Sequence, residues 1–161
     1  MHLAGPETTL SLRKSYIHGR HVDATSGETF ASINPATNTK ICDVEQAGPD
    51  DVDEAVRSAA AGCAEWREVS PVERQRILLR AVAMLRERND ELAHLETLDT
   101  GKPLQETLTI DVATGADVVE YYGGLTQTLH GTTIDFPGEG FARMRREPVG
   151  VCVGIGAWNY P

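Results

Sequence analysis

The chain has 161 residues, of which 40% are hydrophobic and 24% charged, so its composition is typical of a globular protein rather than a disordered one. The formal net charge of −9 argues against a nucleic-acid-binding protein, because such proteins need a clustered basic face to neutralise phosphates. No apolar run approaches the roughly 20 residues of a membrane span, and the N-terminus lacks the features of a signal peptide. We therefore expect a cytoplasmic protein that binds neither nucleic acid nor membrane.

The first part of the chain is rich in β-forming residues. Its pattern predicts strands at 16–19, 29–33 and 41–45. Turns are predicted at 24–27 and 34–37, where Gly, Ser, Asn and Pro gather.

Three helices are predicted in the middle of the chain. The first opens at Pro49, since proline suits the first helical turn, and it carries an apolar stripe at three- and four-residue steps. The second opens at Ser70, which forms a capping box with Glu73, and a further helical segment ends at Gly101. The third spans 108–122.

The last thirty residues combine a hairpin with an apolar segment. Strands at 132–135 and 141–147 flank a turn at 137–140. This hairpin is either an arm that reaches another subunit or a surface feature of its own domain. The segment 149–155 is rich in Val, Ile and Gly, which predicts a buried sheet strand. An apolar strand without a partner would promote aggregation.

Three features could carry chemistry, and each also has a plain structural explanation. Gly154 and Gly156 are only part of a dinucleotide fingerprint, since the next glycine would fall at Asn159, so close packing explains them better. Asn159 either caps a turn or aims its amide N–H at an oxyanion, and Tyr160 is either a core aromatic or a ring face for a cation. Asp99 lies near a helix C-terminus, where solvent or a bound cation must compensate its charge.

The sequence contains no evident pair of nucleophile and base. The three cysteines are odd in number and widely spaced, which excludes a zinc ribbon and argues against a disulfide framework. We interpret Cys42, Cys63 and Cys152 as small buried hydrophobic residues. The residues alone therefore indicate a mixed α/β domain with an incomplete nucleotide-type site.

Several motifs follow one another in the order and spacing of a known family. They are YIHG at 16–19, INPA at 33–36, LETLDTGKP at 95–103, EYYG at 120–123, REPVG at 146–150 and WNYP at 158–161. With these motifs the chain resembles the aldehyde dehydrogenase superfamily from about Tyr16 onward. The segments 85–92, 114–117 and 154–161 resemble most closely the bacterial betaine aldehyde dehydrogenases.

The resemblance implies an α/β fold, namely the N-terminal portion of the aldehyde dehydrogenase fold with an incomplete, Rossmann-like NAD-binding domain. It divides the chain into a helical part of that domain (1–131), part of an oligomerisation arm (132–148), and a first core strand with the start of the cofactor and active-site loop (149–161). It further implies that the full-length form is a homo-oligomer, either a tetramer or a dimer.

The resemblance also implies a chemistry, in which a cysteine thiolate attacks an aldehyde substrate and NAD or NADP accepts a hydride. In such a site Asn159 matches the oxyanion-hole amide, and Tyr160 matches an aromatic residue that cages the trimethylammonium group of betaine aldehyde. The residues that match the cofactor-lining segment are Ile155, Ala157, Trp158 and Asn159. The residues that match a monovalent-cation (potassium) site are Ser32 and Ile33, through backbone carbonyls, and Asp99.

Enzymes of this kind are much longer than this chain. Their catalytic cysteine, general-base glutamate and adenosine-binding strands all lie beyond Pro161. We therefore expect an N-terminal part of such an enzyme, from a truncated gene or a partial sequence, that is inactive by itself. Two alternatives remain open, which are an aminoaldehyde or other aldehyde as substrate, and a non-catalytic role in binding a partner through 132–148.

Overall fold

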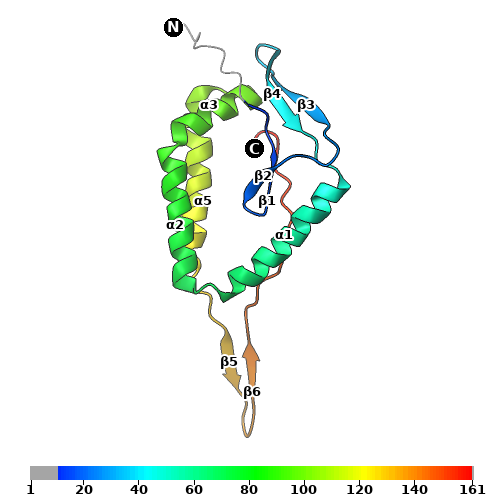
Figure 1. Cartoon of the computed structure of the whole chain (residues 1–161). Coiled ribbons are helices and arrows are strands. Elements are labelled where there is room, and N and C mark those ends of the chain that lie inside the picture. Colours follow the sequence, from blue (N-terminus) through cyan, green and yellow to red (C-terminus); the bar gives the residue numbers. More distant parts are fainter. Residues whose placement is uncertain (1–10, 161) are drawn as a thin grey trace.

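The computed structural model describes residues 11–160, in which three two-stranded antiparallel sheets accompany a helical layer (Figure 1). The strands are β1 (Ser15–Ile17), β2 (Arg20–Val22), β3 (Thr29–Asn34), β4 (Thr39–Glu45), β5 (Thr132–Asp135) and β6 (Phe141–Met144). The helices are α1 (Pro49–Glu68), α2 (Pro71–Glu87), α3 (Asn89–Thr100), α4 (Leu104–Glu106), a π-helical turn η1 (Thr107–Asp111) and α5 (Val112–Leu125).

The N-terminal strands form two hairpins rather than one continuous stretch. The strand predicted at 16–19 ends at Ile17, because His18 and Gly19 take positive φ angles of 52° and 73° and turn the chain into β2. β3 pairs with β4, and the register shifts between Ser32 and Ile33, which is a β-bulge. The predicted strands at 29–33 and 41–45 are thus confirmed, whereas the short strand β2 was missed.

The predicted helix ends are confirmed by their capping contacts. The Ser70 hydroxyl accepts a hydrogen bond from the Glu73 N–H at 3.2 Å, and α3 ends on Gly101 with a φ of 77°. The Asp51 carboxylate accepts hydrogen bonds from the N–H groups of Gly48 (2.8 Å) and Thr25 (3.0 Å), so it joins the start of α1 to the β-region. Hydrogen bonds from the Thr25 hydroxyl, from the Gly48 N–H and from the Thr25 N–H lower the pKa of Asp51.

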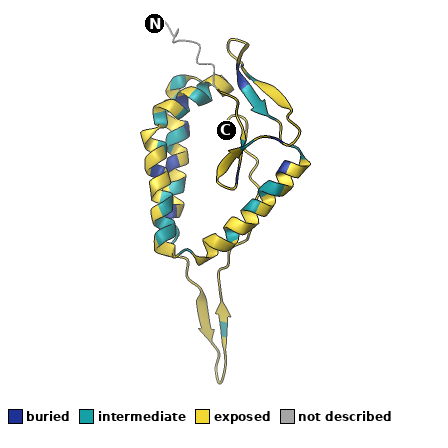
Figure 2. Ribbon diagram, viewed as in Figure 1, coloured by how far each residue is buried: buried dark blue, intermediate teal, exposed yellow. Residues whose placement is uncertain are grey.

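The helices α2 and α5 pack side by side, α3 contacts both, and part of the buried core lies among the three helices (Figure 2). Ala93 and Ala116 are fully enclosed, and Val82 nearly so. Gly123 allows α5 to approach α2, since a Cβ there would lie 3.3 Å from Leu78. None of the helices in the described range is long and apolar enough to span a bilayer.

The third predicted helix, 108–122, has an irregular beginning. It opens with a π-helical turn, η1, where one extra residue is accommodated before α5 starts. The Thr107 side chain is fully buried there, and its hydroxyl lies 2.9 Å from that of Thr97 on α3. This turn carries Asp111 to the inner side of the layer, where it is buried.

The hairpin β5–β6 projects away from the helical layer, and almost all of it is exposed (Figures 1 and 2). The predicted hairpin is confirmed, although its second strand ends at Met144 instead of residue 147. Gly131 stands at its base because a Cβ there would come within 2.3 Å of the Met144 carbonyl oxygen.

The prediction of a buried strand at 149–155 is wrong for the described chain. No strand forms there, and Val149 and Ile155 are 95% and 92% exposed. A strand needs a neighbour for its backbone hydrogen bonds, and no described segment pairs with this one. Cys152 is therefore exposed rather than buried, whereas Cys42 is buried as predicted and Cys63 is intermediate.

Candidate functional site

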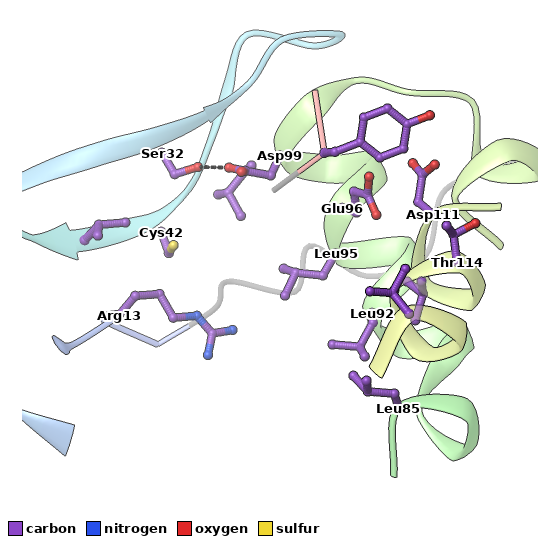
Figure 3. Close-up of a pocket in the computed structure, with 16 residues that line it drawn as sticks. Arg13, Ser32, Cys42, Leu85, Leu92, Leu95, Glu96, Asp99, Asp111 and Thr114 are labelled. Carbon is purple, nitrogen blue, oxygen red and sulfur yellow. Dashed lines mark hydrogen bonds between the residues drawn. The ribbon is translucent and has the colours of Figure 1, made fainter. Parts of the chain in front are cut away.

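A pocket of about 810 Å³ lies between the β3–β4 sheet and the helices α2, α3 and α5 (Figure 3). One end is apolar, and its aliphatic lining consists of Ile41, Val44, Leu85, Leu92, Leu95, Val112 and Val118. The other end carries Ser32, Glu96, Asp99 and Asp111, together with Tyr160 from the end of the chain. The pocket is thus a largely aliphatic hollow with an acidic end, and Arg13 also lines it (Figure 3).

Ser32 and Asp99, two of the predicted cation-site residues, meet at this acidic end. The Ser32 hydroxyl donates a hydrogen bond of 2.7 Å to the Asp99 carboxylate, and Ile33 follows directly at the bulge in β3–β4 (Figure 3). Carboxylate, hydroxyl and carbonyl oxygens are hard donors that suit a hard cation rather than zinc or copper. Within the described range no group of three or more His, Cys, Asp or Glu side chains could hold a metal ion, so any cation here depends on backbone oxygens.

Asn159 and two of the predicted cofactor residues, Ala157 and Trp158, lie together on a tight turn at 157–160. The Tyr160 N–H donates to the Ala157 carbonyl at 2.9 Å and closes the turn around Trp158 and Asn159. Trp158 is 91% exposed, and Ile155 just before the turn is equally open. Asn159 is exposed as well.

Tyr160 is in contact with a cation. The Lys102 ammonium nitrogen lies 3.8 Å from the centroid of the Tyr160 ring, which is within the range of a cation–π interaction. The same ammonium donates a hydrogen bond to Asp111 and lies 3.6 Å from Glu96 and 3.7 Å from Glu106. One lysine thus links an aromatic ring at the end of the chain to three carboxylates on α3, α4 and η1.

The charges in this cluster do not balance. The side chains of Glu96 and Asp111 are only 10% and 3% exposed, and one oxygen of each has no hydrogen-bond partner. Burial, and then the neighbouring Asp111, raise the pKa of Glu96, whereas the hydrogen bond from Lys102 lowers the pKa of Asp111. Burial is the largest single influence on Lys102 and lowers its pKa, but the hydrogen bond to Asp111 and the neighbouring negative charges together outweigh it, so the pKa of Lys102 is raised.

Replacement of Glu96 by Gln is expected to stabilise the protein more at neutral pH than in acid. A carboxyl group whose pKa is raised in the folded state stabilises the fold at pH values below its ordinary pKa of 4.5. This stabilisation is lost as the pH rises through the higher pKa of the folded state. We therefore compare the melting temperatures of Glu96→Gln and the wild type over about 3 pH units, from pH 4 to pH 7, a range that includes the ordinary glutamate pKa. The melting temperature of the variant minus that of the wild type should increase over this range. Glu106→Gln, at a more exposed carboxylate beside the same lysine, is the control. A difference that stays constant or decreases over this range would contradict the prediction.

The chain matches the aldehyde dehydrogenase family over residues 21–161. Similar folds occur in a point mutant of an aldehyde dehydrogenase from Bacillus cereus, at 35% identity with a TM-score of 0.81, which covers 84% of this chain. They also occur in the P. syringae indole-3-acetaldehyde dehydrogenase in complex with NAD+ and IAA (31% identity, TM-score 0.74, 77% of this chain), and in a gamma-glutamyl-gamma-aminobutyraldehyde dehydrogenase from Burkholderia cenocepacia (34% identity, TM-score 0.75, 78% of this chain).

The chain belongs to the aldehyde dehydrogenase family. It is a part of that fold, because it spans only 28%, 26% and 26% of these three structures. The predicted α/β fold class is thereby confirmed, and the family is one of NAD-dependent oxidoreductases, several of whose solved structures contain NAD+. The domain boundaries at 131/132 and 148/149 remain predictions.

The lysine-centred cluster of this family member was not predicted from the sequence. Glu96 lies on α3, Lys102 in the loop after it and Asp111 on η1. Their meeting depends on the π-helical turn, which leaves no mark in the apolar periodicity. The motif LETLDTGKP did contain a signal, since it places an acidic residue and a lysine around a helix-ending glycine. Cys42 lines the pocket as well, but no histidine lies among the lining residues to act as its base.

Proposed function

We propose that this chain forms the N-terminal part of an NAD(P)-dependent aldehyde dehydrogenase that oxidises betaine aldehyde to glycine betaine. The supporting observation is the contact of Lys102 with Tyr160, in which a positively charged nitrogen lies on the face of the ring. A ring that accepts one ammonium group in this way has the electronic character needed for the trimethylammonium group of the substrate.

In this proposal the tight turn supplies groups that bind and orient. Asn159 donates its amide N–H to the oxygen that gains negative charge when the aldehyde is attacked. Trp158, Ala157 and Ile155 form one wall for the cofactor, which accepts a hydride when it is bound. The nucleophile is a cysteine thiolate from outside residues 11–160. The exposure of this segment leaves it free to contact the remainder of such a fold.

The hairpin at 132–148 is proposed as an arm between the subunits of a homo-oligomer, either a dimer or a tetramer. Ile134, Phe136 and Phe141 are each more than half exposed on it, and a group of exposed large apolar side chains is typical of a protein–protein contact surface. The cation site of Ser32, Ile33 and Asp99 is proposed to hold potassium. An aminoaldehyde is the second candidate substrate, because a similar dehydrogenase from Burkholderia cenocepacia is one for gamma-glutamyl-gamma-aminobutyraldehyde.

The choice of substrate can be tested in a chimaera that joins this chain to the remaining portion of the Bacillus cereus aldehyde dehydrogenase. Tyr160→Leu is expected to lower kcat/KM for betaine aldehyde by about 2- to 30-fold, the equivalent of a cation–π contact of ~0.5–2 kcal/mol. The kcat/KM for 3,3-dimethylbutanal, an uncharged analogue of the same shape, should fall clearly less, because this aldehyde loses no cation–π contact. Tyr121→Leu, at an exposed tyrosine on α5, is the matched control. Equal losses for the charged and uncharged aldehydes would refute the proposed role of Tyr160.

A further inference from the structure

The loop between α3 and α4 holds Lys102 in a defined place. α3 ends at Gly101, whose φ is 77° and where a Cβ would lie 2.9 Å from the ring of Pro35, so the reversal of the chain requires glycine. The Thr100 hydroxyl then accepts the Lys102 N–H at 3.2 Å, and Pro103 follows as the N-cap of α4. The backbone of Lys102 is thus fixed from both sides.

The side chain of Lys102 is fixed as well, since all its charged partners converge on one nitrogen. Asp111 accepts its hydrogen bond, and Glu96 and Glu106 lie within 3.7 Å. Three carboxylates around one ammonium keep the lysine charged and in place, because the alternative leaves two largely buried carboxylates without a counter-charge. The direction of the ammonium towards the ring of Tyr160 is therefore determined by the helical layer and not by the tail.

We propose that Lys102 is a positioning residue that anchors the 157–160 turn, and with it the Asn159 amide, by holding its ammonium against one face of the Tyr160 ring. The consequence for catalysis rests on the proposed function, whereas the contact between Lys102 and Tyr160 does not. Residues 149–160 form no strand and are exposed, so the Lys102–Tyr160 contact matters for the placement of this described part of the tail. Since Lys102 covers one face of Tyr160, a cationic substrate uses the opposite face.

Nuclear magnetic resonance on this 17.5-kDa chain tests the anchor directly. The ring current of Tyr160 should shift the Hε protons of Lys102 upfield relative to those of Lys14 and Lys40. Tyr160→Phe should preserve this shift, whereas Tyr160→Leu should abolish it. Both changes lie outside the core, so the fold should persist.

The anchoring of the turn is read from hydrogen exchange of the Tyr160 amide, which closes the turn on Ala157. Lys102→Met should accelerate this exchange by about 2- to 30-fold, while Lys102→Arg, which keeps a cation on the ring, should restore slow exchange. The exchange of Ala93, inside α3, reports whether the fold is intact. Lys40→Met is the control for loss of a lysine elsewhere and should leave the Tyr160 amide unchanged.

An unshifted Lys102 Hε signal in the wild type, or unchanged Tyr160 exchange in Lys102→Met, would overturn the inference. Failure of the proposed function gives a different result. In that case the Lys102 shift and the exchange effect are present, but the chimaera shows no preference for a cationic aldehyde. The two ideas can therefore fail separately.

Discussion

Replacing Asn159 by Ala is expected to lower kcat for aldehyde oxidation by about 10²- to 10³-fold in the chimaera with the Bacillus cereus enzyme. This is the usual effect of removing one hydrogen-bond donor from an oxyanion site. The loss should appear in kcat more than in KM, because the donor acts on charge that develops only in the transition state. The turn that carries Asn159 is closed by a backbone hydrogen bond from Tyr160 to Ala157, so the substitution removes the amide without breaking the turn.

The matched control for this variant is Gln105→Ala, which removes a side-chain amide from an exposed position on α4. It should leave kcat within the error of the assay. A loss in kcat of less than about tenfold for Asn159→Ala would exclude the oxyanion role, because the loss of an ordinary surface contact could explain so small a change. A large rise in KM with unchanged kcat would equally contradict the assignment, because it would mean that Asn159 binds substrate and transition state alike.

Replacing Ala116 by Leu is expected to destabilise the chain by about 1–3 kcal/mol, since a larger side chain in a filled interior forces its neighbours to move. Ala116 is fully enclosed on α5, whose packing against α2 is the most extensive helix–helix contact in the described range. Chemical denaturation followed by circular dichroism measures this change as a lower midpoint at unaltered slope.

The adjacent position provides a control in the same helix. Gly115 has open space around its missing Cβ, so Gly115→Ala should stabilise the chain by about 0.5–1 kcal/mol through helix propensity alone. Changes in the free energy of unfolding that have opposite signs at these two successive residues would locate the packed face of α5. Similar effects of both substitutions would show that the helix is not packed as described.

Much of the fold could be predicted because its determinants are local. Ser70, Gly101 and the turn residues at 137–140 each specify a helix end or a hairpin within a few positions, and the structure confirms these ends. The hairpin of β1 and β2 was missed because its turn places His18 before Gly19 at a positive φ, where Asn, Asp or Gly is the usual hairpin signal. Local chemistry therefore predicts where elements begin and end better than it predicts how they pair.

Non-local features could not be predicted in the same way. The segment 149–155 has the composition of a buried strand, but strand formation needs a partner, and the described chain does not provide one. The meeting of Ser32 with Asp99 followed only from family resemblance, because the two lie 67 residues apart. The contact of Lys102 with Tyr160 was not foreseen at all, because it depends on a loop, a π-helical turn and the tail together.

We propose that this chain carries the oxyanion and cofactor segment of an aldehyde dehydrogenase, with the nucleophile supplied from elsewhere in the complete fold. The most direct test is the formation of NADH from betaine aldehyde and NAD, measured in parallel for the 161-residue chain and for the chimaera. We expect turnover from the chimaera and none above background from the chain alone. Turnover by the chain alone, abolished by replacing one of its own three cysteines, would contradict the account.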